Sequence, residues 1–175
     1  LSASLAAADC RVLVVDCDPQ ANSTSGLGYP ADLERSSLYD LLLGQSTLED
    51  VQLKTQVENL DIVPSSRHLA GANIELVDLS AREFRLKKKL APAREDYHFV
   101  LMDCPPALDL LTLNALVAAD TVLIPIQCEY YALEGMSKLL NTIRLIQRHL
   151  NPKLQIEGVL LTMFDGRLNL SRQVA

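Results

Sequence analysis

The chain has 175 residues, of which 49% are apolar and 22% are charged, and its net charge is −6. A chain of this length and apolar content can bury one sizeable core, so one domain is the default expectation. The net negative charge excludes a general polyanion binder, and any nucleic-acid contact must be a local patch. No apolar run approaches the roughly 20 residues that cross a bilayer, and no membrane partner is expected.

The first residues resemble the end of a signal peptide, because residues 1–8 are small and apolar. They lack an initiator methionine and a basic start, however, which argues against that interpretation. The second half of a helix fits them better. Residues 171–175 also stop in a helix-compatible stretch. We therefore expect a single domain, residues 1–175, that is truncated at both ends.

Short apolar runs alternate with helix-compatible segments along the chain. The expected strands are residues 11–16, 59–64, 98–103, 121–126 and 156–162. The expected helices are residues 38–43, 69–91, 107–119 and 132–150, and a mobile loop is expected at residues 23–30. Ser37 and Asp40 have the spacing of a helix N-terminal cap, and Gly44 is placed to end that helix. Strands that are apolar on both faces predict an α/β fold, with a mainly parallel sheet in a three-layer α/β/α arrangement.

Two of the expected strands end in carboxylates. Asp16 and Asp18 end the first, and Asp103, followed by two prolines, ends the other. The carboxyl ends of parallel strands meet at one edge, where open α/β sheets bind ligands. Neighbouring carboxylates repel one another unless a cation or an ordered water lies between them. The alternative is that these aspartates only cap turns and helices. Because the pattern occurs twice, a shared site is favoured.

Two families have strands of this kind. The response-regulator receiver domain has a similar acid pocket and phosphoacceptor strand. The 87 residues between Asp16 and Asp103 are too many for that small fold, and no Lys-Pro pair follows the later strand. Acetyl-phosphate labelling of Asp103 would revive this interpretation.

The second family is matched nearly end to end. The chain resembles the ParA/Soj family of deviant Walker A P-loop ATPases, which are relatives of MinD. Residues 14–28 resemble the switch I segment, and residues 102–106 resemble the Walker B strand with switch II. Residues 124–135 resemble a segment of the Soj-like branch, and residues 161–167 a strand end beside the nucleotide base. The motifs DCDPQAN and QCEYYALEG are typical of ParA rather than of MinD.

This resemblance implies roles for individual residues. Asp18 corresponds to a catalytic acid that orients or activates the attacking water. Asp16 corresponds to a second acid near the magnesium ion and the phosphate loop, and Asp103 to the Walker B acid that holds Mg²⁺ through water. The implied adenine-pocket residues are Met163, Phe164 and Asp165, and the implied DNA contact is Arg167.

The resemblance also implies an activity and partners. They are ATP hydrolysis with Mg²⁺ in chromosome or plasmid partitioning, an ATP-dependent homodimer, non-specific DNA and a ParB-type centromere-binding protein. Such a protein is cytoplasmic and associated with the nucleoid. The alternatives are a MinD-like or other ATPase that positions cargo or the division site, and a paralogue without ATPase activity.

The chain departs from the family in one respect. The phosphate loop Lys-Gly-Gly-x-Gly-Lys-Thr-Thr and the first core strand are expected before residue 1, and the sequence contains no such loop. Backbone N–H groups and lysines of that loop cradle the phosphates. We therefore expect these 175 residues alone to bind ATP poorly and to be inactive.

The remaining features favour structural interpretations. The four cysteines have no metal or disulfide spacing and are expected to be small packed thiols: Cys10, Cys17, Cys104 and Cys128. A solvated helix face is favoured over a DNA patch for the basic cluster Arg82, Arg85, Lys87, Lys88, Lys89 and Arg94. Core packing is favoured over an interface for Tyr130 and Tyr131. The three histidines receive no role.

Overall fold

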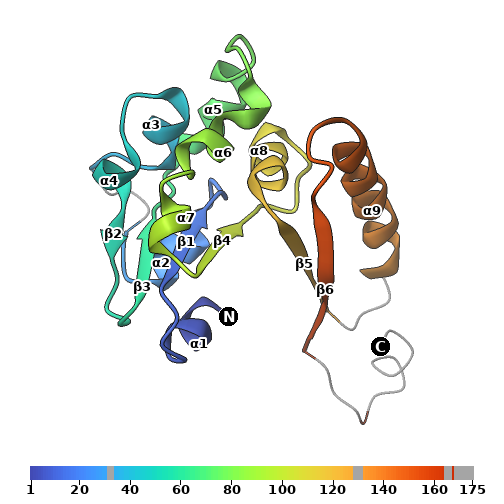
Figure 1. Ribbon diagram of the computed structural model, residues 1–175, viewed down its shortest axis with the longest axis horizontal. Helices are drawn as coiled ribbons and strands as arrows, with labels where there is room; N and C mark the ends of the chain where they lie inside the picture. Colours follow the sequence, from blue (N-terminus) through green and yellow to red (C-terminus); the bar gives the residue numbers. More distant parts are fainter. Residues whose placement is uncertain (31–33, 128–131, 164–166, 168–175) are drawn as a thin grey trace. The chain divides into compact units, whose positions relative to one another are not determined.

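The computed structural model describes residues 1–30, 34–127, 132–163 and 167, and for residues 132–135 the backbone alone. The chain divides into two compact units, Leu1–Ala118 and Ala119–Ala175 (Figure 1). The single domain expected over residues 1–175 stays a prediction.

The first unit contains a four-stranded sheet. Strand β1 (Val12–Asp16) lies between β3 (Leu60–Val63) and β4 (Phe99–Asp103), and both neighbours run parallel to it. A short strand, β2 (Leu53–Lys54), pairs antiparallel with β3. All five residues of β1 are buried, as a central strand of a covered parallel sheet requires. The three strands predicted in this unit are confirmed, and β2 is an addition.

Helices cover both faces of this sheet. Val12 and Val14 pack in one cluster with Ala6 of α1 (Ser2–Ala6). Leu13 and Val15 point to the opposite face, because side chains alternate along a strand. They pack in a larger cluster with residues of α3 (Leu38–Leu43), α4 (Leu48–Val51), α5 (Leu69–Glu75), α6 (Arg85–Lys89) and α8 (Leu110–Ala118). The three-layer α/β/α arrangement is therefore confirmed.

Helix ends follow local chemistry. Ser37 and Asp40 form the predicted capping box of α3, and Gly44 ends the helix with a φ of 83°. The start predicted for the helix at 107–119 is wrong. The Asp109 carboxylate accepts hydrogen bonds from the N–H groups of Leu111 and Thr112, and α8 begins only at Leu110.

The long helix predicted at residues 69–91 is wrong. Helix α5 ends at Glu75, and the chain resumes at a 3-10 turn, η1 (Arg82–Phe84), which leads into α6. Ala81, just before η1, has a φ of 51°, which lies in the left-handed region and interrupts a right-handed helix. A further short helix, α7 (Ala93–Asp96), follows Pro92.

The second unit is a parallel strand pair and a helix. Strand β5 (Thr121–Gln127) pairs with β6 (Gln155–Thr162), and α9 (Ala132–His149) connects them. Ile143 and Ile146 of α9 are buried. All three elements were predicted and are confirmed. Nowhere in the described residues does a helix have the length and apolar character needed to cross a bilayer.

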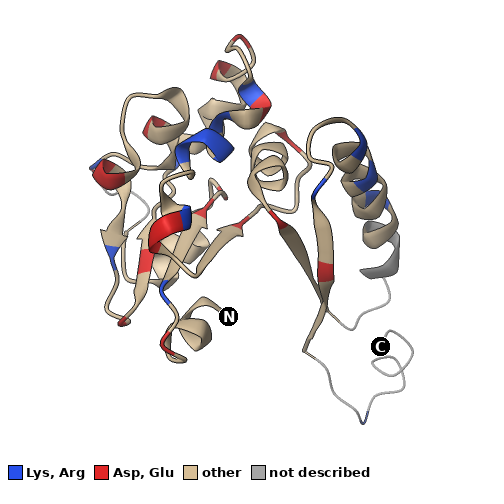
Figure 2. Ribbon diagram, in the orientation of Figure 1, with Lys and Arg blue, Asp and Glu red and all other residues tan. Residues whose placement is uncertain are grey.

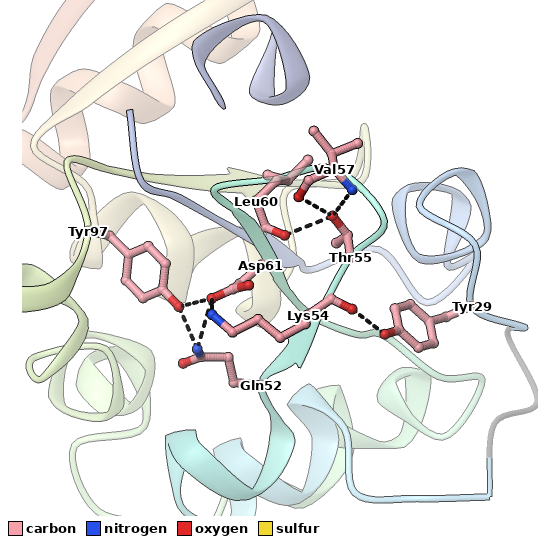
Figure 3. A network of polar contacts seen from close by, with 8 residues as sticks. All are labelled: Tyr29, Gln52, Lys54, Thr55, Val57, Leu60, Asp61 and Tyr97. Atoms are coloured by element: carbon pink, nitrogen blue, oxygen red, sulfur yellow. Dashed lines mark hydrogen bonds and ion pairs between the residues drawn. The ribbon is translucent and has the colours of Figure 1, made fainter. Parts of the chain in front are cut away.

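A polar network lies at the amino-terminal half of the first sheet (Figure 3). Asp61, which pairs with Leu13 across the sheet, is buried, and its Oδ2 accepts hydrogen bonds from Lys54, Gln52 and Tyr97. Tyr97 follows α7, so the network joins the end of that helix to β2 and β3. The acids Asp16 and Asp103 lie at the opposite, carboxyl end of the parallel strands.

Part of the basic cluster has a structural role. Figure 2 shows basic residues along α6. Arg85 Nε donates to the Leu42 carbonyl and Lys89 Nζ donates to the Ser46 carbonyl at 3.2 Å, so both bind the end of α3 and the turn after it. Lys87 and Lys88 are exposed, as the predicted solvated face requires.

Candidate active site at the carboxyl ends of β1 and β4

Two of the predicted acids lie side by side at the carboxyl edge of the sheet. Asp16, the last residue of β1, is in register with Asp103, the last residue of β4. Cys17 follows Asp16, and its N–H donates a hydrogen bond to the Asp103 carbonyl at 2.8 Å. The expectation that the two strand ends meet at one edge is therefore confirmed.

Asp16 is fully buried, and both of its carboxylate oxygens accept hydrogen bonds. Oδ2 accepts from the N–H of Thr24 at 2.7 Å and from its hydroxyl at 2.6 Å, and Oδ1 accepts from the Asp18 N–H at 3.2 Å. Burial raises the pKa of Asp16, the charge of Asp103 raises it further, and the hydrogen bonds from Thr24 and Asp18 offset part of this effect. The net pKa is raised. A positive charge near the two acids would stabilise the ionised form.

Asp103 is the more open of the two acids. Its side chain is exposed, and its Oδ2 accepts a hydrogen bond from the hydroxyl of Ser23. Ser23 and Thr24 belong to a short helix, α2 (Asn22–Gly26), where the sequence predicted a mobile loop. That prediction is wrong for this segment, because adjacent hydroxyls bind two different acids and tie the helix to both strand ends.

Asp18 lies in a turn directly beyond β1. Its Oδ1 accepts from the N–H of Gln20 at 2.9 Å, and its carbonyl accepts from the N–H of Ala21 at 2.9 Å. Ala21 has a φ of 56° and closes the turn. The side chain is half-buried, and its Oδ2 accepts no hydrogen bond among the described residues. One carboxylate oxygen is thus available to an external group.

The capping alternative and the site interpretation are compatible here. Asp16 does bind the N–H groups at the start of α2, and Asp18 does form a turn. These bonds fix the acids in place and leave Asp103 accessible. Within the described residues, no group of three or more His, Cys, Asp or Glu side chains could hold a metal ion. A cation at this edge would need phosphate or water ligands, which Mg²⁺ commonly retains.

Sequence reasoning missed Ser23, Thr24 and Ser65. Ser65 follows β3, and its N–H donates to the Thr24 hydroxyl at 2.9 Å. The available signal was a run of hydroxyl residues directly after the two acids. A sequence does not say which of those hydroxyls face the acids, since that depends on the helical turn of α2.

Comparison with known proteins decides the family. A family model described as an AAA domain matches residues 1–156. The sporulation initiation inhibitor protein Soj of Bacillus subtilis is 56% identical over 99% of this chain, and the chromosome partitioning protein ParA of Myxococcus xanthus is 51% identical over 99%. The chain belongs to the ParA/Soj family. It spans 69% of the length of the Bacillus relative and 62% of that of the Myxococcus relative.

Solved structures agree with the fold of a ParA/Soj chain. One is described as cobyrinic acid a,c-diamide synthase from Mycobacterium smegmatis with bound ADP and magnesium. Its TM-score is 0.95 and its identity 39%, over 99% of this chain and 70% of that one. A plasmid partition protein from Borrelia burgdorferi is 25% identical with a TM-score of 0.77, over 98% of this chain and 73% of that one. The P-loop NTPase fold of the ParA type is thereby confirmed.

The other predicted site residues of this ParA/Soj chain belong to the second unit. Met163 follows β6, is 83% exposed and has a φ of 54°. Arg167 is also exposed. Phe164, Asp165, Tyr130 and Tyr131 lie outside the described residues. The nucleotide-binding and DNA-binding roles stay predictions.

The described cysteines fit the packing interpretation. Cys10, Cys17 and Cys104 are free thiols, and Cys128 lies outside the described residues. Cys17 is buried directly after Asp16, beside the candidate site. The neighbouring Cys104 thiol and burial raise the pKa of Cys17 well above its ordinary value, which keeps it in the less reactive protonated form.

Proposed function

We propose that this ParA/Soj protein is an ATP hydrolase that acts in chromosome or plasmid partitioning. The register of β1 against β4 carries the proposal, because it sets Asp16 beside Asp103 with Asp18 just beyond. The chromosome-partitioning ATPase Soj of Treponema pallidum, 48% identical over 99% of this chain, supports the assignment.

Asp18 is the residue assigned to the attacking water. Its carboxylate points one oxygen into the turn, toward the Gln20 N–H, and keeps the other for a water molecule. An acid placed in this way orients the water or accepts its proton as it attacks the γ-phosphate. Asp18 lies in an ordered turn, so its carboxylate does not need to be arranged during the reaction.

Asp103 and Asp16 are assigned to the magnesium side of the site. When bound, Mg²⁺ offsets the charge on the phosphate oxygens. Asp103 is accessible and would hold the ion through water. Asp16 already accepts three hydrogen bonds, so it acts through its charge and through water. A relative of known structure from Mycobacterium smegmatis was crystallised with an ATP analogue and magnesium, which supports this assignment.

The proposed partners follow from the family. They are non-specific DNA, a ParB-type centromere-binding protein and a second copy of the chain in an ATP-dependent dimer. Arg167 is proposed as a DNA contact and Met163, with Phe164 and Asp165, as the adenine pocket. A DNA-bound dimer of this kind is associated with the nucleoid in the cytoplasm.

The test is an ATPase assay on the full-length protein with two variants. Asp18→Asn keeps an oxygen for the Gln20 N–H but removes the charge. We expect kcat to fall by about 100-fold or more while ATP affinity stays unchanged. Asp50→Asn is the matched control, because Asp50 also accepts hydrogen bonds from a backbone N–H, that of Thr47, at a helix start in the same unit.

The outcomes separate the candidates. Unchanged turnover in Asp18→Asn contradicts the role of this residue. ATP binding without turnover in the wild type favours the paralogue that lacks ATPase activity. Normal turnover without DNA binding favours an ATPase that positions another cargo.

A further inference from the structure

Two buried hydroxyl residues to which the sequence assigned no role join three elements beside the acids. Thr24 of α2 is 0% exposed, and Ser65, directly after Pro64 at the end of β3, is 2% exposed. The Thr24 hydroxyl donates to Asp16 at 2.6 Å and accepts from the Ser65 N–H at 2.9 Å. The Ser65 hydroxyl donates to the Asp18 carbonyl at 2.7 Å.

The directions of these hydrogen bonds are fixed by chemistry. An ionised carboxylate only accepts, so the Thr24 hydroxyl must donate its single proton to ionised Asp16. It can then only accept from the Ser65 N–H. A carbonyl likewise only accepts, so the Ser65 hydroxyl donates to Asp18. The chain of bonds therefore has one arrangement and cannot reverse.

The consequence is that the backbone of Asp18 is held on both sides. Its N–H donates to Asp16, which is itself held by Thr24, and its carbonyl accepts from Ser65. The turn bond from the Gln20 N–H then sets the direction of the carboxylate. One of these fixed points, Thr24, comes from the helix that directly follows the turn, and the other, Ser65, is 47 residues away in sequence, just after β3.

We propose that Thr24 and Ser65 are positioning residues that hold Asp18 in place for its action on the attacking water. The proposal rests on the proposed ATPase function. An acid that acts on water must be held to within a fraction of an ångström, and a misplacement of about 1 Å lowers the rate by roughly 100-fold. The Thr24 hydroxyl binds Asp16 and the Ser65 N–H, and the Ser65 hydroxyl binds the Asp18 carbonyl, so both residues act through Asp16 and Asp18.

The chain offers a matched control for Ser65. Ser66 is the next residue and is also buried, but its hydroxyl bonds to the Ser37 hydroxyl at 3.2 Å, on the side of α3. In the full-length protein we expect Ser65→Ala to lower kcat by about 10- to 100-fold with KM for ATP unchanged. Ser66→Ala is expected to keep the wild-type kcat.

Thr24 provides a second pair of variants. Thr24→Val keeps the shape of the side chain but removes the hydroxyl, whereas Thr24→Ser keeps the hydroxyl and removes a methyl group. We expect Thr24→Val to lose turnover and Thr24→Ser to retain most of it. A purely structural role for Thr24 in packing predicts the reverse order.

Amide hydrogen exchange gives a readout that is independent of turnover. Loss of the Ser65 hydroxyl should speed exchange of the Gln20 and Ala21 amides, which Asp18 binds, by about tenfold relative to Ser66→Ala. If Ser65→Ala and Ser66→Ala have equal exchange rates and equal kcat, the positioning role is overturned. The proposed ATPase function still stands in that case if the wild-type protein hydrolyses ATP. Absence of turnover in the wild type overturns both.

Discussion

The network around Asp61 allows a quantitative test of what stabilises the first sheet (Figure 3). Lys54 and Asp61 form an ion pair at 2.8 Å, but the Lys54 side chain is 87% exposed. An exposed ion pair contributes about 0.2–1 kcal/mol. The Tyr97 hydroxyl donates to the same carboxylate from a partly buried position. A hydrogen bond to a charged group contributes about 1.5–3 kcal/mol, so we expect the tyrosine to contribute more.

The perturbation is therefore Tyr97→Phe, with Lys54→Met as the matched control. We expect Tyr97→Phe to lower the free energy of unfolding by about 2 kcal/mol and Lys54→Met by less than about 1 kcal/mol. For an m-value of about 2 kcal/mol per M, Tyr97→Phe lowers the urea midpoint by about 1 M.

Equilibrium urea denaturation followed by far-UV circular dichroism measures both values. Circular dichroism is preferred to fluorescence because the chain has no tryptophan and the Tyr97→Phe variant loses one of its five tyrosines. Raising the salt concentration should reduce the Lys54 contribution and leave that of Tyr97 nearly unchanged. The reasoning is refuted if Lys54→Met costs as much as Tyr97→Phe.

Three further predictions concern pH, a helix end and nucleotide binding. Burial and the hydrogen bond to Asp61 raise the pKa of Tyr97, so the free energy of unfolding should fall as pH rises above about 10. Denaturation at several pH values should show a less steep fall in Tyr97→Phe. Gly44→Ala should lower the melting temperature, because Gly44 has a φ of 83° and the new Cβ would lie 3.3 Å from Arg85 Nη2. Gly26→Ala is the control and should leave the melting temperature unchanged, because no atom lies within 4 Å of its new Cβ. Residues 1–175 alone should bind MgATP more weakly than millimolar by calorimetry, since they contain no glycine-rich phosphate loop. Sub-millimolar binding would contradict this.

Elements with strong local signals were predictable. The apolar run of β1, the capping box at Ser37 and the amphipathic α9 each depend on neighbouring residues in the sequence. The failures occur where a long-range contact competes with local preference. The helix predicted at 69–91 ends at Glu75, and Ala81 then takes a left-handed conformation, although alanine is a good helix former. The Asn114 side chain, from α8, binds the Arg82 carbonyl at the start of η1 and the Leu86 N–H in α6, and these bonds favour the broken path.

The sequence by itself determined which carboxylates lie at the carboxyl edge of the first sheet. The order of strand, acid and proline placed Asp16, Asp18 and Asp103 there, because a carboxylate directly after an apolar parallel strand lies at the edge of the sheet where ligands bind. Only the tertiary structure decided how those acids are held. The partners Ser23, Thr24 and Ser65 come from a short helix and from the end of another strand. A hydroxyl forms a hydrogen bond only when distance and direction are both right, and neither is written in the order of residues.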